Sequence, residues 1–171
     1  MNNAVVTLTI RFLVLVLFQV ALLNHMTVHI LGDTNPYLYI LFIIWYPITD
    51  SDDRLIFIFL SFLIGLSIDL FSDSGGIHAA SSVLIGYLRK PYMRLSFGVG
   101  YEQQAQKLSQ SSYAQRFIYL SLMIVTHHLT MYSLESFSFA SMGYVLQKTL
   151  LTSLFTLILV LLTISIFSKK Q

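Results

Sequence analysis

The sequence predicts an all-α polytopic membrane protein with about six transmembrane helices, and three observations lead to that prediction. Hydrophobic residues make up 56% of the 171 residues and charged residues only 11%, whereas soluble domains carry about 25% charged residues. Several apolar runs approach or exceed the roughly 20 residues that a spanning helix needs. The basic residues gather in alternate connections between these runs. We therefore expect one integral membrane domain covering residues 1–171, because a soluble fold this apolar would expose large hydrophobic patches.

The apolar runs define six predicted spans, two of which are short. The spans cover roughly residues 4–23, 36–47, 55–71, 77–88, 117–137 and 145–167. The two short runs are 36–47 and 77–88, and about 11 helical residues reach only about 16 Å. They must extend through flanking residues, thin the bilayer, or enter it without crossing. The polar, basic stretch 89–115 is expected to be a cytoplasmic loop, either as an interfacial helix or as a mobile segment.

The placement of basic residues predicts the orientation. With six crossings and a cytoplasmic N-terminus, the predicted cytoplasmic segments hold Arg54, the basic residues of 89–116, and the Lys169–Lys170 tail. The outer loops 24–35, 72–76 and 138–144 then contain no Lys or Arg, as the positive-inside rule requires. With a cytoplasmic N-terminus, five crossings would put both the basic loop and the basic tail outside. Four crossings would differ only in placing Arg54 outside, so that alternative stays open.

A row of small and acidic residues marks one face of the third predicted span. Ser61, Gly65, Asp69 and Asp73 are each four residues apart. Small residues at this spacing let helices approach closely, and a carboxylate near an apolar segment is disfavoured unless it has a partner or water. We expect a packing or polar contact site here, with a solvated helix end as the alternative for Asp69. A leucine at Gly65 should overpack the contact, whereas an alanine should be mild.

The stretch after this row predicts a turn. Gly75 and Gly76 allow backbone angles that other residues avoid, and Ser74 or Asp73 is a candidate cap for a helix that begins near Ile77. No G-K-[ST] sequence follows, so a phosphate-binding loop is not expected.

Polar residues at the ends of several spans reach a similar predicted depth near the outer face. They form either a shared polar cluster or a set of ordinary interface residues: His25, Asp69, His78, Glu135 and Lys148. His127 and His128 lie mid-helix, point about 100° apart, and lack an H-E-x-x-H pattern. Hydrogen-bonded packing is therefore the expected role of these two histidines.

No feature of the sequence predicts catalysis. The chain has no cysteine, which excludes disulfides, thiolate metal sites and cysteine nucleophiles. No nucleophile–base pair, cofactor motif, metal motif or basic stripe for nucleic acid is found. Asp50, Asp52 and Asp53 beside Arg54 could hold a divalent ion against a phosphate, but a solvated acidic loop is the favoured interpretation. We expect a non-enzymatic protein without a cofactor, embedded in the lipid bilayer.

The stretch from Gly65 to Arg89 has the sequence GLSIDLFSDSGGIHAASSVLIGYLR. Its distinctive features are Gly65, Leu66, Asp69, Gly75, Gly76, His78, Ala79, Tyr87 and Leu88, followed by a basic stretch. This pattern resembles the signature of the MreD family of rod shape-determining proteins. The chain length, the Asn35–Tyr37 start of the second run and the basic tail also fit.

This resemblance implies a fold similar to the substrate-binding subunits of energy-coupling-factor transporters. It implies a role in cell elongation and peptidoglycan synthesis beside MreC, MreB, RodA and the penicillin-binding partner of RodA. It also places the chain in the bacterial inner membrane with both termini in the cytoplasm. Two other functions stay open, namely a vitamin-type binding subunit of a membrane transporter and a lipid-modifying enzyme that uses the acidic run.

Overall fold

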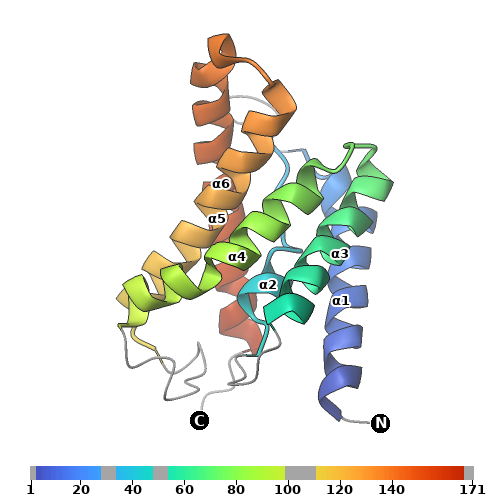
Figure 1. The fold of residues 1–171 in the computed structure, drawn as a ribbon, viewed down its shortest axis with the longest axis vertical. Coiled ribbons are helices and arrows are strands. Elements are labelled where there is room, and N and C mark those ends of the chain that lie inside the picture. The colour runs from blue at the N-terminus through green and yellow to red at the C-terminus, as the bar shows by residue number, and fades with distance from the viewer. Residues whose placement is uncertain (1–2, 28–33, 48–53, 99–110, 168–171) are drawn as a thin grey trace.

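The computed structural model describes residues 3–27, 34–47, 54–98 and 111–167. Five long helices make up most of this part of the chain (Figure 1). They are α1 (Asn3–Ala21), α3 (Arg54–Ser72), α4 (Ile77–Phe97), α5 (Tyr113–Ser136) and α6 (Met142–Phe167). The short elements are η1 (Leu23–His25), α2 (Leu41–Ile44) and η4 (Phe139–Ser141).

The long helices form two antiparallel hairpins with one additional helix. The hairpins are α3–α4 and α5–α6, and α1 lies beside α3 (Figure 1). Helices α1, α3 and α5 begin at the end of the molecule drawn at the bottom of Figure 1, where α4 and α6 end. We call this the lower end. The α3–α4 turn lies at the opposite, upper end, and α5 and α6 project beyond that turn.

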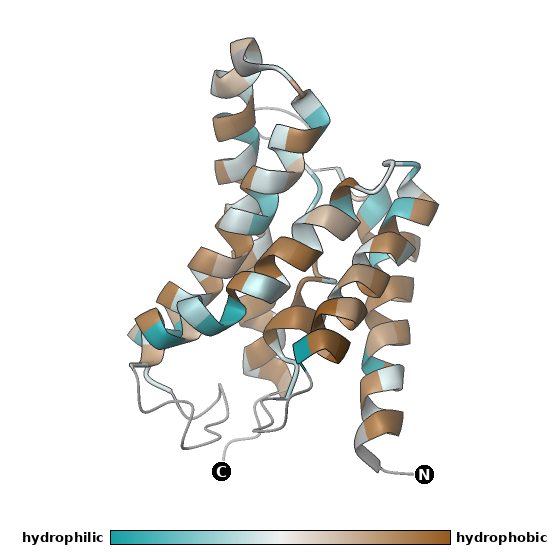
Figure 2. Ribbon diagram, viewed as in Figure 1, coloured by the Kyte–Doolittle hydropathy of each residue, from teal (hydrophilic) through white to brown (hydrophobic). Residues whose placement is uncertain are grey.

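Four of these helices are long and apolar enough to cross a membrane, which confirms the predicted helical membrane character. They are α1, α3, α5 and α6. Their outer faces expose large apolar side chains such as Leu17, Leu70, Leu150 and Ile166, and Figure 2 shows apolar residues along their length. In water such faces would be unstable, whereas lipid is a compatible solvent for them.

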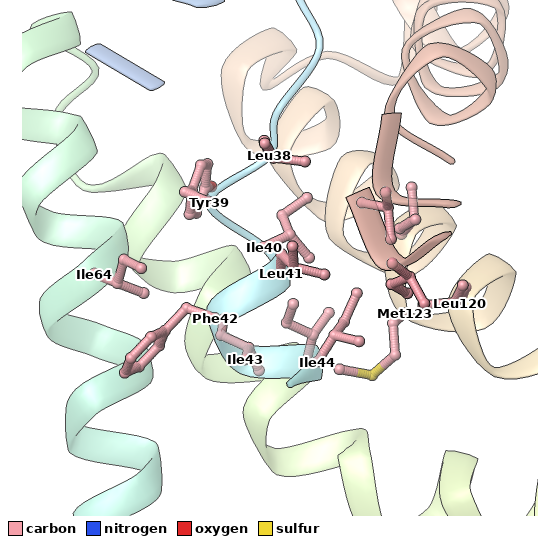
Figure 3. Packing of buried hydrophobic residues seen from close by; sticks show 14 of the residues in the cluster. Leu38, Tyr39, Ile40, Leu41, Phe42, Ile43, Ile44, Ile64, Leu120 and Met123 are labelled. Carbon is pink, nitrogen blue, oxygen red and sulfur yellow. The ribbon is translucent and has the colours of Figure 1, made fainter. Parts of the chain in front are cut away.

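The predicted span 36–47 is not a transmembrane helix, so the prediction of about six such helices is wrong at this point. Residues 34–40 precede a single helical turn, α2 (Leu41–Ile44). Every side chain from Leu38 to Ile44 is at most 7% exposed. Figure 3 shows this segment between α3 and the helices α5 and α6, beside Ile64, Leu120 and Met123. We call residues 34–47 the core segment.

The core segment is apolar because protein surrounds it, not lipid. An extended chain rises about 3.3 Å per residue, about twice the rise of a helix, so a short run can return from the upper end of α1 toward the start of α3. Non-helical backbone at membrane depth is tolerated only where protein or water covers it. The burial of the core segment meets that condition.

The fourth predicted span and the loop after it also need correction. Helix α4 continues through Pro91 to Phe97, so the first part of the predicted loop 89–115 is helical. At 21 residues, α4 is about 31 Å long. Its charged second half, with Arg89, Lys90 and Arg94, made it look like a loop. The choice between an interfacial helix and a mobile segment concerns residues 99–110, which lie outside the described residues.

Candidate functional site

Helices α3 and α4 approach each other closely at Gly65. A methyl group on Gly65 would lie 2.5 Å from the carbonyl oxygen of His78 and 2.6 Å from the Cα of Ala79. Four residues earlier, Ser61 faces Gly86 of α4, where an added methyl group would lie 2.9 Å from the Ser61 hydroxyl oxygen. The predicted small-residue face is therefore confirmed as a helix contact. It excludes side chains larger than hydrogen at Gly65 because the obstacle is backbone.

Asp69 continues this face and caps the next helix. Its carboxylate accepts hydrogen bonds from the Ser74 hydroxyl (2.5 Å) and from the backbone N–H groups of His78 (3.0 Å) and Ala79 (2.8 Å). The first N–H groups of a helix have no partner within the helix and carry a partial positive charge. Asp69 satisfies two of them from the neighbouring helix, although it stands outside α4.

This arrangement corrects the expected cap of α4 and confirms the expected polar contact of Asp69. The N-cap residue is Gly76, which has no side chain to offer, so neither Ser74 nor Asp73 caps the helix. Asp69 is only 5% exposed, so it is not a solvated helix end. The turn brings the end of α3 back over the start of α4, and that proximity makes a cap across the hairpin possible.

The turn itself matches the prediction. Gly75 and Gly76 have φ angles of 64° and 95°, which lie in the region that glycine adopts without strain. Asp73 also has a positive φ, 51°, and lies beyond the last residue of α3. The fourth member of the predicted row therefore belongs to the turn and not to the helix contact.

The ring of His78 contacts the core segment. Its Nδ1 lies 3.0 Å from the Tyr39 hydroxyl, and that hydroxyl lies 2.7 Å from Nε2 of His127. The chain of side chains links α4, the core segment and α5. Next to it, Nδ1 of His128 lies 2.9 Å from the carbonyl oxygen of Ile124. The predicted role of His127 and His128 as hydrogen-bonded packing residues is confirmed.

The residues predicted to form a polar cluster with Asp69 do not surround its side chain. All three side-chain hydrogen bonds of Asp69 stay within the α3–α4 hairpin. His25 and Glu135 are exposed, and Lys148 is half-buried with its ammonium 5.5 Å from the centre of the Tyr144 ring. Of the five predicted residues, the structure joins Asp69 and His78 through the backbone N–H of His78.

Two polar side chains that the sequence analysis did not single out support the core segment. Gln19 of α1 is fully buried, accepts from the N–H of Leu38 (2.7 Å) and donates to the carbonyl of Pro36 (3.2 Å). Thr156 of α6 accepts from the N–H of Tyr37 (3.1 Å). Their signal in the sequence was an amide and a hydroxyl inside otherwise apolar runs, where an unpaired polar group is costly.

Arg89 supports the other end of the core segment. Its guanidinium donates to the carbonyl of Tyr46 (2.5 Å) and to the hydroxyl of Tyr119 (3.3 Å), and it lies 4.9 Å from the centre of the Phe57 ring. The side chain is 7% exposed, so its predicted place in a cytoplasmic loop is wrong. Arg89 joins α4 to α3, α5 and the core segment.

In the described part of the chain, no group of three or more His, Asp or Glu side chains has the arrangement of a metal site. Asp50, Asp52 and Asp53 lie outside the described residues. No family model, curated protein or solved structure matches the chain. The α3–α4 hairpin and the polar supports of the core segment are therefore interpreted from their own geometry.

Replacing Gln19 with methionine tests how far the core segment depends on α1. Methionine keeps a similar size but leaves the N–H of Leu38 and the carbonyl of Pro36 without their partner. A buried unmet group costs about 1–3 kcal/mol, so we expect a clearly lower midpoint of thermal unfolding in detergent. Thr163→Val is the control, because among the described residues the Thr163 hydroxyl bonds to Leu159 of its own helix. Equal midpoints for the two variants would contradict this role.

Proposed function

We propose that this chain is a non-catalytic membrane component of the bacterial rod complex, which directs cell elongation and peptidoglycan synthesis. The resemblance to the MreD family supports this proposal. The observation that carries it is that the residues of the resembling motif form one structural unit. Gly65 makes a close helix contact, Asp69 caps α4 from α3, and Gly75 and Gly76 shape the turn between them.

A scaffold needs a rigid shape and free outer faces, and the hairpin supplies the first of these. Two buried polar residues of the motif, Asp69 and His78, make hydrogen bonds within the chain. The apolar outer faces of α1, α3, α5 and α6 are surfaces on which lipid or the membrane helices of MreC and RodA could pack. MreB and the penicillin-binding partner of RodA complete the set of partners that the resemblance implies.

A second candidate function is a vitamin-type binding subunit of a transporter, and one observation favours it. Aromatic and imidazole rings gather in the interior where the core segment meets α4 and α5: Tyr37, Tyr39, Tyr132, His78, His127 and His128. Such rings are typical of ligand sites with a few polar groups. A small molecule that stays with the purified protein, detected by mass spectrometry, would favour this function over the scaffold.

Depletion of the protein in its native cell tests the proposed function. We expect rods to shorten and round up, and new peptidoglycan to be inserted without its normal pattern along the cell side. Normal elongation and normal shape after depletion would overturn the proposal. Complementation by the wild-type gene is the control for indirect effects of depletion.

The proposed orientation puts the lower end in the cytoplasm of a bacterial inner membrane. Arg11 lies 5.8 Å from the Trp45 ring and Arg54 lies 4.8 Å from the Tyr87 ring, and α1 and α3 begin at this end (Figure 1). Paired cationic and aromatic residues suit a membrane interface. The N-terminus and the C-terminus are both cytoplasmic in this proposal.

Single-cysteine labelling tests the orientation without background, because the chain has no cysteine. Ala114 and Ser138 are both exposed and lie at opposite ends of α5. We expect a membrane-impermeant maleimide applied to intact spheroplasts to label Ser138→Cys and not Ala114→Cys. Both sites should react after the membrane is opened. External labelling of Ala114→Cys alone would show the inverse orientation.

A further inference from the structure

The histidine–tyrosine cluster in the interior contains polar atoms whose hydrogen-bonding needs the described residues do not meet. We use this name for Tyr37, Tyr39, Tyr132, His78, His127 and His128. His127 and His128 are both fully buried. Neither Nδ1 of His127 nor Nε2 of His128 has a hydrogen-bond partner among the described residues, and the same holds for the hydroxyl of Thr149.

Thr149 belongs to the face of α6 that packs on α5. Ser153, one helical turn further along α6, approaches Nδ1 of His128 at 3.3 Å, and residues four apart share a helix face. A buried polar group without a partner is costly, so three of them on these packed helices would be a large penalty for a chain of this size.

The hydrogen-bond partner of Nδ1 of His128 determines whether Nε2 of the same ring is a donor or an acceptor. The carbonyl oxygen of Ile124 only accepts hydrogen bonds, so Nδ1 of His128, 2.9 Å away, carries the proton and donates. In a neutral imidazole the other nitrogen is then an acceptor. A guest at Nε2 of His128 must therefore donate a hydrogen bond.

The partners of His127 lead to the opposite requirement. The Tyr39 hydroxyl has one proton, so it can donate to only one of its two imidazole neighbours. Its distance of 2.7 Å to Nε2 of His127 fits an O–H donor, and its distance of 3.0 Å to Nδ1 of His78 fits an N–H donor. We assign the Tyr39 proton to the bond with His127. Nδ1 of His127 then carries a proton and needs an acceptor.

We propose that the histidine–tyrosine cluster is an internal water-binding site. Water both donates and accepts hydrogen bonds, and it is small enough for a close-packed interior. It donates to Nε2 of His128, accepts from Nδ1–H of His127, and is a partner for the Thr149 hydroxyl. The site is lined by α5, α6 and the core segment, so it places water inside the bundle and away from the lipid.

Water-edited solid-state NMR on protein labelled with ¹⁵N-histidine and ¹⁵N-isoleucine, in phosphatidylethanolamine–phosphatidylglycerol vesicles, tests this site. We expect magnetisation to pass from water to the ring nitrogens of His127 and His128. The exposed His25 is the positive control, and the backbone amides of Ile40 and Ile64, both 0% exposed, are the negative controls. Two matched variants assign the signals. His127→Gln keeps an acceptor toward Tyr39 and removes the Nδ1 donor, whereas His128→Asn keeps a donor toward Ile124 and removes the Nε2 acceptor.

Three results would overturn the proposal. The first is that neither ring receives magnetisation from water at mixing times that saturate the His25 signal. The second is a higher midpoint of thermal unfolding for His128→Asn, because removal of an acceptor stabilises the fold only if that acceptor had no partner. Unchanged or lower stability, together with water transfer, supports the site. A co-purified organic molecule in place of water would overturn it and favour the transporter-subunit function instead, whatever the depletion experiment shows.

Discussion

Replacing Gly65 with alanine is expected to destabilise the protein by at least about 1–3 kcal/mol, the range for overpacked cores. The added methyl group would lie 2.5 Å from the carbonyl oxygen of His78 and 2.6 Å from the Cα of Ala79. Backbone cannot rotate away as a side chain can, so α3 and α4 must separate. Separation also pulls the N–H groups of His78 and Ala79 away from Asp69. The midpoint of thermal unfolding in detergent should fall sharply.

The chain provides two matched glycines for comparison. Gly143 of α6 has nothing within 4 Å of an added methyl group, and alanine favours a helix by about 1 kcal/mol over glycine, so Gly143→Ala should be neutral or stabilising. At Gly86 the obstacle is the Ser61 hydroxyl, which can rotate, so Gly86→Ala should be intermediate. Equal stability of Gly65→Ala and Gly143→Ala would show that the close helix contact does not exist in the membrane.

The mild effect that sequence reasoning assigned to Gly65→Ala is wrong on this geometry. Spacing along one helix predicts which residues share a face, and Ser61, Gly65 and Asp69 do lie together against α4. Spacing does not give the distance between the two helix axes. That distance depends on both helices at once, and at Gly65 it leaves room for hydrogen only.

The core segment shows a second limit of sequence reasoning. Hydropathy reports that residues 36–47 avoid water, but lipid and protein interior satisfy this requirement equally. The length of the run was the available clue, since about 11 residues are too few for a spanning helix. The buried Gln19 was another, because an amide inside an apolar helix needs a partner, and here that partner is non-helical backbone.

The basic residues in the second half of α4 led to the incorrect prediction of a loop there. Arg89 looked like part of a cytoplasmic loop because basic residues usually mark one. Its long side chain instead reaches the carbonyl of Tyr46 and the hydroxyl of Tyr119. No local pattern distinguishes a solvated arginine from one that satisfies a distant carbonyl. The turn at Gly75 and Gly76, by contrast, depends on local backbone angles, and it was predicted correctly.

Asp69→Asn is expected to destabilise the hairpin by about 2–3 kcal/mol, although it changes only one oxygen to an amide nitrogen. Both carboxylate oxygens accept hydrogen bonds: Oδ1 from Ser74 and His78, and Oδ2 from Ala79. Asparagine has one acceptor oxygen, so its NH₂ group must face an N–H or O–H donor. The negative charge at the N-terminus of α4 is lost as well.

Asp73→Asn is the matched control for this change. Asp73 is exposed and has a φ of 51°, a conformation that asparagine tolerates as well as aspartate. We expect Asp73→Asn to keep the wild-type midpoint of thermal unfolding, whereas Asp69→Asn and Asp69→Leu should both lower it. Hydrogen–deuterium exchange should show faster exchange of the backbone amides of His78 and Ala79 in the Asp69 variants only.

The same pair of variants connects the hairpin to the proposed function. If the rigid α3–α4 hairpin is what partners in the rod complex recognise, Asp69→Asn should impair restoration of rod shape nearly as much as Asp69→Leu. Asp73→Asn should restore it fully. Membrane fractions must contain equal amounts of each variant, so that loss of shape is not loss of protein. The opposite result is that Asp69→Asn gives normal rods at normal abundance while the amides of His78 and Ala79 exchange faster. That result would show that the cap stabilises the hairpin but is not needed for the function.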